Sequence, residues 1–185
     1  KAFFPGYTAA ERVATYATLG GIPAYLERFA PGLSLDDNIR GHLLRRTGMF
    51  RSEPAVLISD LVRETRIYEA ILRTVAGGAH TPAEIASQTG LLPNNLPPYL
   101  KRLQELRLIE RRVPATIPLD QAQSTTRSRY RLRDAYLRFY FRFIEPHQPI
   151  IELGNVETLW RRIAGQFNAF VGATAFEDLC REWLL

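Results

Sequence analysis

The stretch of sequence that most constrains the fold runs from Thr81 to Gly90 and reads TPAEIASQTG. The threonine can cap a helix, the proline after it suits the first helical position, and Glu84 can accept hydrogen bonds from the backbone around the cap. Gly90 then ends the helix, because glycine readily adopts the left-handed conformation that closes a last turn. A second helix is expected from about 95 to 107, so the pair predicts a helix-turn-helix.

Two stretches beyond these helices alternate apolar and polar residues, as strands do. They run from Leu108 to Val113 and from Ser128 to Arg133, with a polar segment between them. An amphipathic helix from Ile67 to Ala76, which ends at a glycine pair, precedes the helix-turn-helix. Three helices followed by a two-stranded hairpin predict a winged helix with a long, polar wing tip.

Helical patterns also occupy the rest of the chain, so the predicted fold is mainly α. We expect a small helical array at residues 1–62, the winged helix with its β-hairpin wing at 63–135, and further C-terminal helices at 136–185. Gly172 is expected to end one of these last helices. An aromatic stripe at helical spacing is interpreted as core packing, and its members are Tyr136, Phe139, Tyr140 and Phe143.

Positive charge is concentrated in the winged helix. Nine basic and three acidic residues lie between Lys101 and Arg133, whereas the net charge of the whole chain is +5. Such a local basic surface can bind phosphates, although salt bridges within the protein or contact with another domain explain the charge equally well. The candidate DNA or phosphate contacts are Asn94, Asn95, Lys101, Arg102, Arg111, Arg112, Arg127, Arg129 and Arg131.

Sequence-specific DNA reading is not expected from the second helix of the motif. Its first turn carries Pro97 and Pro98, where a reading helix needs exposed donors such as Arg, Asn or Gln. Asn94 and Asn95 can reach bases, but asparagine in front of a helix more often caps it. DNA binding is therefore expected to be weak, non-specific and sensitive to salt.

Residues of the kinds that carry catalysis are scarce. The three histidines are far apart in sequence and none has metal-ligand spacing, so we predict no metal site and no catalytic residue. Cys180 lies among apolar positions of the last helix and is expected to be a small core residue. Glycine pairs occur, but neither is followed by the Lys-Ser/Thr of a phosphate-binding loop.

The cytoplasm is the expected location. A single cysteine permits no internal disulfide, and no apolar run reaches the roughly 20 residues that span a bilayer, so no membrane partner is expected. The chain opens on Lys1 without a signal peptide, which favours a piece of a longer protein.

Seven short motifs occur in the order found in prokaryotic archaeal-type ATPases of the AAA+/STAND group. Each motif is weak alone, but together they span nearly the whole chain. They are Gly20-Gly-Ile-Pro-Ala-Tyr-Leu26, Ser52-Glu-Pro54, Tyr68-Glu-Ala-Ile-Leu72, Thr81-Pro-Ala-Glu-Ile-Ala86, Tyr99-Leu-Lys-Arg-Leu103, Arg129-Tyr-Arg-Leu-Arg-Asp134, and Gly172 with Phe176-Glu-Asp-Leu-Cys180. The chain thus resembles the C-terminal part of these ATPases.

The resemblance implies a P-loop ATPase core followed by a helical lid, the winged helix, and the start of a C-terminal module thought to be related to PD-(D/E)XK nucleases. Gly21, Ile22 and Pro23 are similar to the Gly-x-Pro motif by which such lids meet the adenine side of a nucleotide. The same three residues also suit an ordinary turn between helices. Glu177 resembles the acid on the first helix of the nuclease-like module, or else forms a common i, i+4 pair with Arg181.

ATP and Mg²⁺ are accordingly expected in the parent ATPase, and no cofactor is expected to bind this chain alone. The implied partner is the P-loop core, and the chain by itself is not expected to hydrolyse ATP. Two alternatives stay open, namely a stand-alone winged-helix transcription regulator and a protein-interaction module without a nucleic-acid role. A regulator is expected to dimerise and to prefer one DNA sequence, whereas the ATPase fragment is expected to be a monomer.

Overall fold

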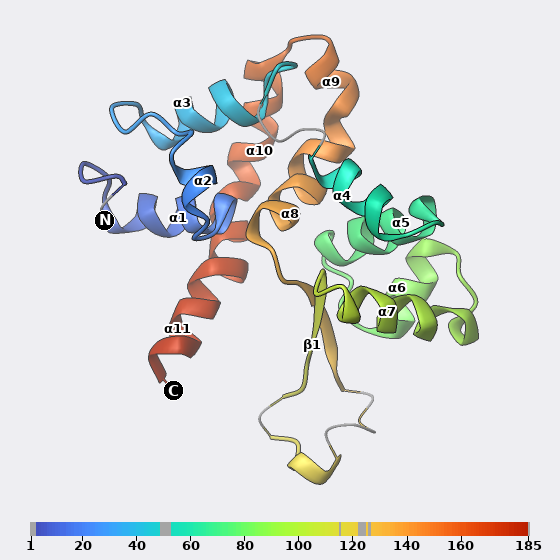
Figure 1. Cartoon of the computed structure of the whole chain (residues 1–185). Helices are drawn as coiled ribbons and strands as arrows, with labels where there is room; N and C mark the ends of the chain where they lie inside the picture. The colour runs from blue at the N-terminus through green and yellow to red at the C-terminus, as the bar shows by residue number, and fades with distance from the viewer. Residues whose placement is uncertain (1–2, 49–52, 115, 122–124, 126, 185) are drawn as a thin grey trace. The chain divides into compact units, whose positions relative to one another are not determined.

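The computed structural model describes residues 3–48, 53–114, 116–121, 125 and 127–184. Within these residues the fold is mainly α, as the sequence predicts, and its strands form a single antiparallel pair (Figure 1). The chain divides into two compact units, unit 1 with residues 1–53 and 143–185 and unit 2 with residues 54–142. The division into residues 1–62, 63–135 and 136–185 comes from sequence patterns and from the family resemblance, and it stays a prediction.

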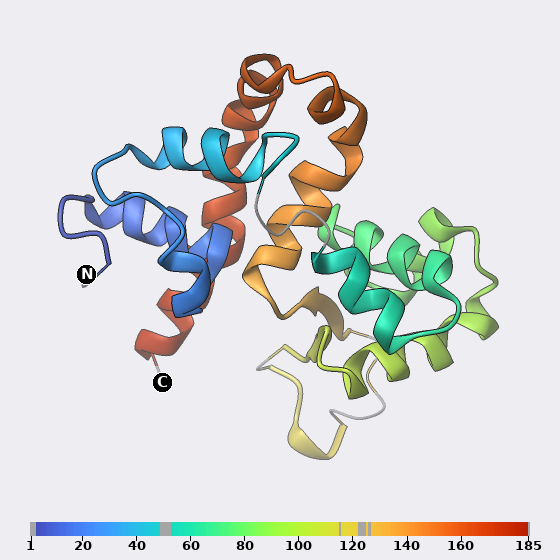
Figure 2. The ribbon, with the colours of Figure 1, turned by 45° about the horizontal axis from the view of Figure 1, so that its top comes forward.

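Unit 1 is built from helices of both ends of the chain. The N-terminal stretch supplies α1 (Ala9–Leu19), α2 (Pro23–Leu26), α3 (Leu35–Asn38) and the π-helical turn η1 (Ile39–Leu43). The C-terminal stretch supplies η5 (Glu145–His147), α9 (Gln148–Glu152), α10 (Val156–Val171), η6 (Gly172–Phe176) and α11 (Glu177–Leu184). α1 packs against α10 and η6, as Figures 1 and 2 show.

Apolar spacing on α10 explains how it joins the two stretches. Leu159, Ile163 and Phe167 recur every four residues and are buried on one face of the helix. On α1, Ala17 and Leu19 are buried as well. Each large apolar side chain removed from water in this way contributes about 1.5–3 kcal/mol, so burial holds the two ends of the chain together.

The turn between α2 and α3 is organised by Asn38, whose side chain is fully buried. Its Oδ1 accepts from the Ala30 N–H at 2.7 Å, and its Nδ2 donates to the Tyr7 Oη and to the Ala30 carbonyl oxygen, each at 2.9 Å. The Tyr7 hydroxyl donates in turn to the Leu33 carbonyl oxygen at 3.0 Å. Burial raises the pKa of Tyr7, so this hydroxyl stays protonated and able to donate.

Unit 2 contains the three helices and the hairpin that the sequence predicts. Its helical segments are α4 (Glu53–Leu61), which begins at the unit boundary, α5 (Thr65–Ala76), α6 (Pro82–Thr89), η2 (Pro93–Asn95), α7 (Leu96–Glu105), η3 (Leu119–Gln121), α8 (Ala135–Phe139) and η4 (Tyr140–Ile144), which crosses into unit 1. β1 (Ile109–Arg112) pairs with β2 (Arg129–Leu132). The strands begin beside α5 and α7, whereas η3, near the far end of the hairpin, lies away from these helices (Figure 1).

Apolar faces of α5, α6 and α7 form the core of unit 2. α5 packs against α6 and β2, and α7 packs against β1. Gly90 ends α6 in the left-handed conformation, with a φ of 71°, as predicted. The buried side chains of the three helices are Ile71, Leu72, Val75, Ile85, Ala86, Leu96, Leu100 and Leu103.

The aromatic stripe of α8 and η4 is buried, which confirms its interpretation as core packing. All four of its rings are at most 5% exposed. The Asp134 carboxylate caps α8 by accepting from the Leu137 N–H at 2.7 Å. Within unit 1, the ring of Phe143 meets that of Phe170 edge to face, with 5.1 Å between the ring centroids.

One predicted helix end is wrong. Gly172 lies inside a helical run that continues from α10 through η6 into α11, and its φ is −60°. Glycine permits the left-handed turn that ends a helix but does not impose it. Here the helix continues, and η6 packs against α1.

The network around Asn38 predicts a large loss of stability in the variant Asn38→Ala. The substitution leaves the partly buried N–H of Ala30 without its acceptor and removes the buried hydrogen bond to Tyr7, so we expect the free energy of unfolding of unit 1 to fall by about 3 kcal/mol. Urea unfolding followed by the fluorescence of Trp160, which lies buried on α10, measures this change. The control is Asn168→Ala, which changes an exposed residue of α10. Equal losses of stability in the two variants would contradict the structural role of Asn38.

Candidate functional site

Gly21, Ile22 and Pro23 lie in the turn between α1 and α2. Gly20 closes α1 with a φ of 68°, and Pro23 is the first residue of α2. All three residues are exposed; the side chain of Ile22 is 40% exposed and that of Tyr16 38%. A Cβ atom at Gly21 would lie 3.7 Å from the Tyr16 ring. The turn therefore presents an apolar surface at the start of a helix.

The N-terminus of α6 in unit 2 is closed by its own side chains. The Thr81 hydroxyl oxygen accepts from the Glu84 N–H, and the Glu84 carboxylate accepts from the N–H groups of Thr81 and His80, each at 2.9 Å. These backbone hydrogen bonds, that of Thr81 first, lower the pKa of Glu84 from 4.5 to about 2. The predicted capping box is thus confirmed.

The same corner of unit 2 anchors the hairpin. The Tyr130 N–H donates to the His80 carbonyl oxygen at 2.7 Å, and the His80 Nδ1 lies 3.1 Å from the Tyr130 carbonyl oxygen. β2 is therefore bonded on both edges, to β1 on one side and to His80 on the other. Because His80 directly precedes the capping box, the position of the hairpin depends on how α6 begins.

The strand register sorts the predicted phosphate contacts onto two faces. Arg112 lies opposite Arg129 and Arg131 lies opposite Glu110, and these four share a face because side chains alternate along a strand. Arg112 is ion-paired with Glu110, whereas Arg129 is exposed. Like charges directly opposite each other repel, so this face favours an anion beside Arg112 and Arg129.

Arg111 belongs to the other face of the hairpin. It lies opposite Tyr130, and its Nη2 donates to the Thr125 carbonyl oxygen at 3.0 Å. Arg127 is exposed just before β2. The hairpin therefore gathers three of the predicted contacts on one face and turns Arg111 away from them.

α7 exposes few groups able to read bases. Pro97, Pro98 and Lys101 are exposed. Arg102 is exposed too, but its guanidinium lies 3.6 Å from the Glu105 carboxylate. The exposed side of this helix thus combines prolines with charges, and its first turn lacks the donors that a major groove requires.

The interpretation of Asn95 as a helix cap is wrong. Asn94 and Asn95 are exposed in η2, and Asn95 directly precedes α7, but its side chain makes no capping hydrogen bond. A capping side chain accepts from the N–H of the second or third helical residue. Those residues are Pro97 and Pro98, which have no N–H to donate.

An ion-pair cluster around Arg40 in unit 1 has no counterpart among the predicted site residues. The Nη1 atom of Arg40 lies 2.9 and 3.0 Å from the two carboxylate oxygens of Glu157, and the Nη2 atom of Arg40 forms an ion pair with Asp37. Burial is the largest single influence and lowers the pKa of Arg40, but the hydrogen bonds and charges of Glu157 and Asp37 together outweigh it, so this pKa is raised. The hydrogen bond from Ser34, followed by the charge of Arg40, lowers the pKa of Asp37. No local pattern signals this cluster, because Arg40 and Glu157 are 117 positions apart.

The assignment of Cys180 to the core is wrong, because this residue is exposed on α11. It shares a helix face with Phe176, which is 58% exposed, and with Trp183, which is 86% exposed. Glu177 begins α11 and is exposed as well. The side chain of Arg181, its suggested i, i+4 partner, lies outside the part of the chain that the structure describes.

The histidines have separate structural contacts. The His42 ring stacks on Phe29 with 5.9 Å between centroids, and the His147 Nδ1 lies 3.0 Å from the Phe143 carbonyl oxygen. Across the described residues, no three His, Cys, Asp or Glu side chains come together as metal ligands do. Nor does any helix in the described ranges have the length and apolar character needed to cross a membrane.

Comparison with known proteins finds relatives without an assigned function. Residues 140–185 match the model of a family described as archaeal and bacterial proteins of unknown function. Over 185 residues, the whole of this chain, the sequence is 33% identical to an uncharacterized protein of Methanocaldococcus jannaschii. The chain spans about 40% of the length of that relative, which is consistent with a fragment of a larger protein. No solved structure matches the chain.

The low pKa of Glu84 predicts how the stability of unit 2 depends on pH. Because this pKa is about 2 in the folded protein against 4.5 ordinarily, the unfolded chain binds more protons between these values. The stabilisation from Glu84 is complete above about pH 4.5 and is lost as the pH falls toward 2. Glu84→Gln is expected to flatten this part of the stability curve, measured as the urea midpoint from pH 7 to pH 2.

Glu69→Gln, on α5 of the same unit, is the matched control. It removes a carboxylate that caps no helix and should leave the acid limb of the curve as in the wild type. If the two variants lost stability alike as the pH fell, the capping role of Glu84 would be refuted.

Proposed function

We propose that this chain is the C-terminal part of a P-loop ATPase, in which unit 1 meets the bound nucleotide and unit 2 is a winged helix that contacts phosphates or a partner domain. The order of the seven motifs supports this assignment, as does a relative of which the chain matches only about 40%. The observation that carries it is the exposed apolar turn at Gly21, Ile22 and Pro23.

Adenine is a flat, largely apolar ring system, and this turn has the properties needed to contact one. Gly21 lets a ligand approach the backbone, while Ile22 and the Tyr16 ring supply apolar contact area. A turn that served only to connect two helices would gain stability by burying Ile22. ATP and Mg²⁺ would be held mainly by the P-loop core, and this chain would add the lid contact.

The ATPase assignment makes a prediction about the longer polypeptide. We expect a buried strand followed by Gly-x-x-x-x-Gly-Lys-Ser/Thr in the region that precedes Lys1, because that loop cradles the phosphates and its hydroxyl binds Mg²⁺. The part of the M. jannaschii relative that this chain does not match should carry the same motif. Sequencing the gene region in front of the codon for Lys1 tests this, and a longer chain without the motif would remove the assignment.

For unit 2, the order α5, α6, α7, β1, β2 supports the winged-helix interpretation. The hairpin face with Arg112, Arg129 and Arg131 favours contact with the phosphate backbone of nucleic acid. The prolines of α7 disfavour base reading, so we expect affinity without sequence preference. A stand-alone regulator, in contrast, needs a reading helix, and an interaction module needs no phosphate contact at all.

Charge reversal on the hairpin distinguishes these functions. The double variant Arg129→Glu and Arg131→Glu should bind random-sequence duplex DNA more weakly than the wild type. The slope of log affinity against log salt concentration should also become shallower by about 2, because each phosphate contact contributes about 0.9 to that slope. Fluorescence anisotropy over a salt series measures both. The control is Arg63→Glu with Arg66→Glu, which reverses two exposed charges of unit 2 outside the hairpin.

Each other outcome favours one alternative. Tight binding to a single sequence that survives moderate salt would identify a regulator. If neither the wild type nor the variants bound DNA, unit 2 would be a protein-interaction module.

A further inference from the structure

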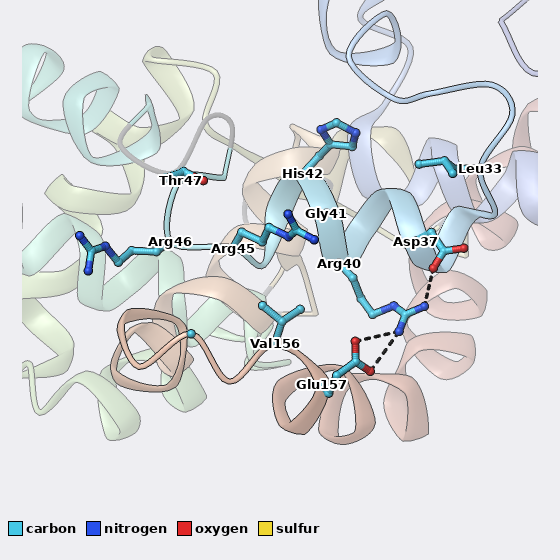
Figure 3. Close-up of a pocket in the computed structure, with 11 residues that line it drawn as sticks. Leu33, Asp37, Arg40, Gly41, His42, Arg45, Arg46, Thr47, Val156 and Glu157 are labelled. Carbon is cyan, nitrogen blue, oxygen red and sulfur yellow. Dashed lines mark hydrogen bonds and ion pairs between the residues drawn. The ribbon is translucent and has the colours of Figure 1, made fainter.

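A cavity of about 880 Å³ opens in unit 1 between the end of η1 and the start of α10. Figure 3 shows residues that line it, among them Arg40, Gly41, Arg45, Arg46 and Glu157. Neither the Gly21-Ile22-Pro23 turn nor the hairpin contributes to this lining. The cavity is therefore independent of the surfaces that carry the proposed function.

The acidic groups of the cavity are already paired with an arginine. Both carboxylate oxygens of Glu157 accept from Arg40, and Asp37 pairs with the other end of the same guanidinium (Figure 3). A cationic ligand would have to displace Arg40 from this cluster. One guanidinium offsets only one of the two carboxylates, so this cluster carries −1, and an anionic ligand can be attracted only through the other arginines of the lining.

Arg45 and Arg46 also line the cavity, so three arginines stand against two carboxylates and the lining has a net charge of +1. The side chain of Arg45 is exposed and extends toward Gly41 and Arg40 in Figure 3, whereas Arg46 extends away from them. Within the described part of the chain, the Arg45 guanidinium makes no ion pair or side-chain hydrogen bond. The His42 ring is directed toward Phe29, on which it stacks. Arg45 is thus the cation best placed to receive a ligand.

Space for the ligand exists beside Gly41. Gly41 lies in the middle of η1, and beyond its chain neighbours and the backbone of its own helix a Cβ atom built on it would meet nothing within 4 Å. A side chain of ordinary size at this position would project into the opening between Arg40 and Arg45. The absence of a side chain at Gly41 therefore keeps the wall of the cavity open.

We propose that this cavity binds a small phosphate-bearing anion, with Arg45 as the principal ligand and the Arg40 cluster as a rigid wall. The planar guanidinium matches two phosphate oxygens at once. A phosphate group offers these oxygens whether it belongs to free phosphate or to a phosphorylated metabolite.

Titration of the full 185-residue chain with inorganic phosphate, at constant ionic strength, tests the proposal. In ¹⁵N-resolved NMR spectra we expect saturable shifts of the backbone amides from Arg45 to Thr47. Arg45→Gln should weaken phosphate binding by about 10- to 100-fold, the range for a hydrogen bond to a charged group. Arg28→Gln, which removes an exposed arginine of unit 1 outside the cavity, should bind as the wild type does.

Substitution of Gly41 provides a second test that leaves the arginines intact. Gly41→Ala should retain binding, whereas Gly41→Glu, which places a carboxylate in the opening, should abolish it. AMP should shift the amides from Arg45 to Thr47 as phosphate does, and adenosine should leave them unchanged, because recognition is through the phosphate group. The proposal would be overturned if these amides showed no saturable shifts, if Arg45→Gln or Gly41→Glu bound like the wild type, or if adenosine shifted the same amides equally. Since only amides of the cavity are read, none of these results bears on the ATPase assignment.

Discussion

The joining of the two ends of the chain is the constraint on which the rest of the structure depends. α1 packs against α10 and η6, and Arg40 pairs with Glu157, which lies 117 positions further along the sequence. Unit 1 cannot form until both segments are present, so unit 2 is an insertion within it. The chain passes between the units twice, after Glu53 and after Arg142, and any motion of unit 2 must be accommodated at these two connections.

The arginines of this protein differ in what their charges already contact, and that difference locates the candidate surfaces. Arg40 is held by two carboxylates, Arg111 donates to a carbonyl oxygen, and Arg112 has Glu110 beside it. Arg45 and Arg129 are exposed, the first in a cavity of unit 1 and the second on the hairpin of unit 2. A count of basic residues does not separate the two groups. Of the arginines named here, Arg45 and Arg129 form no ion pair with another described residue, so their charges can attract a phosphate most directly.

Local patterns in the sequence predicted the features of unit 2 that local chemistry decides. The capping box of Thr81 and Glu84 and the left-handed Gly90 involve neighbours in sequence, and the structure has both. Features that depend on remote contacts were missed or wrongly predicted. The residues near Asn38 and Arg40 in sequence do not indicate which distant residues these two side chains contact. The apolar spacing around Cys180 predicts a helix face, but it does not indicate whether another element covers that face. The side chain of Asn95 is a third case, decided by two prolines whose missing N–H groups remove its partner.

The central functional claim is that the turn at Gly21, Ile22 and Pro23 faces a nucleotide. Hydrogen exchange of the longer polypeptide, measured by mass spectrometry with and without Mg²⁺ and ATP, tests it most directly. If the claim holds, ATP slows exchange of the backbone amides between Gly20 and Leu26, because a bound nucleotide covers an exposed turn. Bound ATP that left exchange in this stretch unchanged would contradict it.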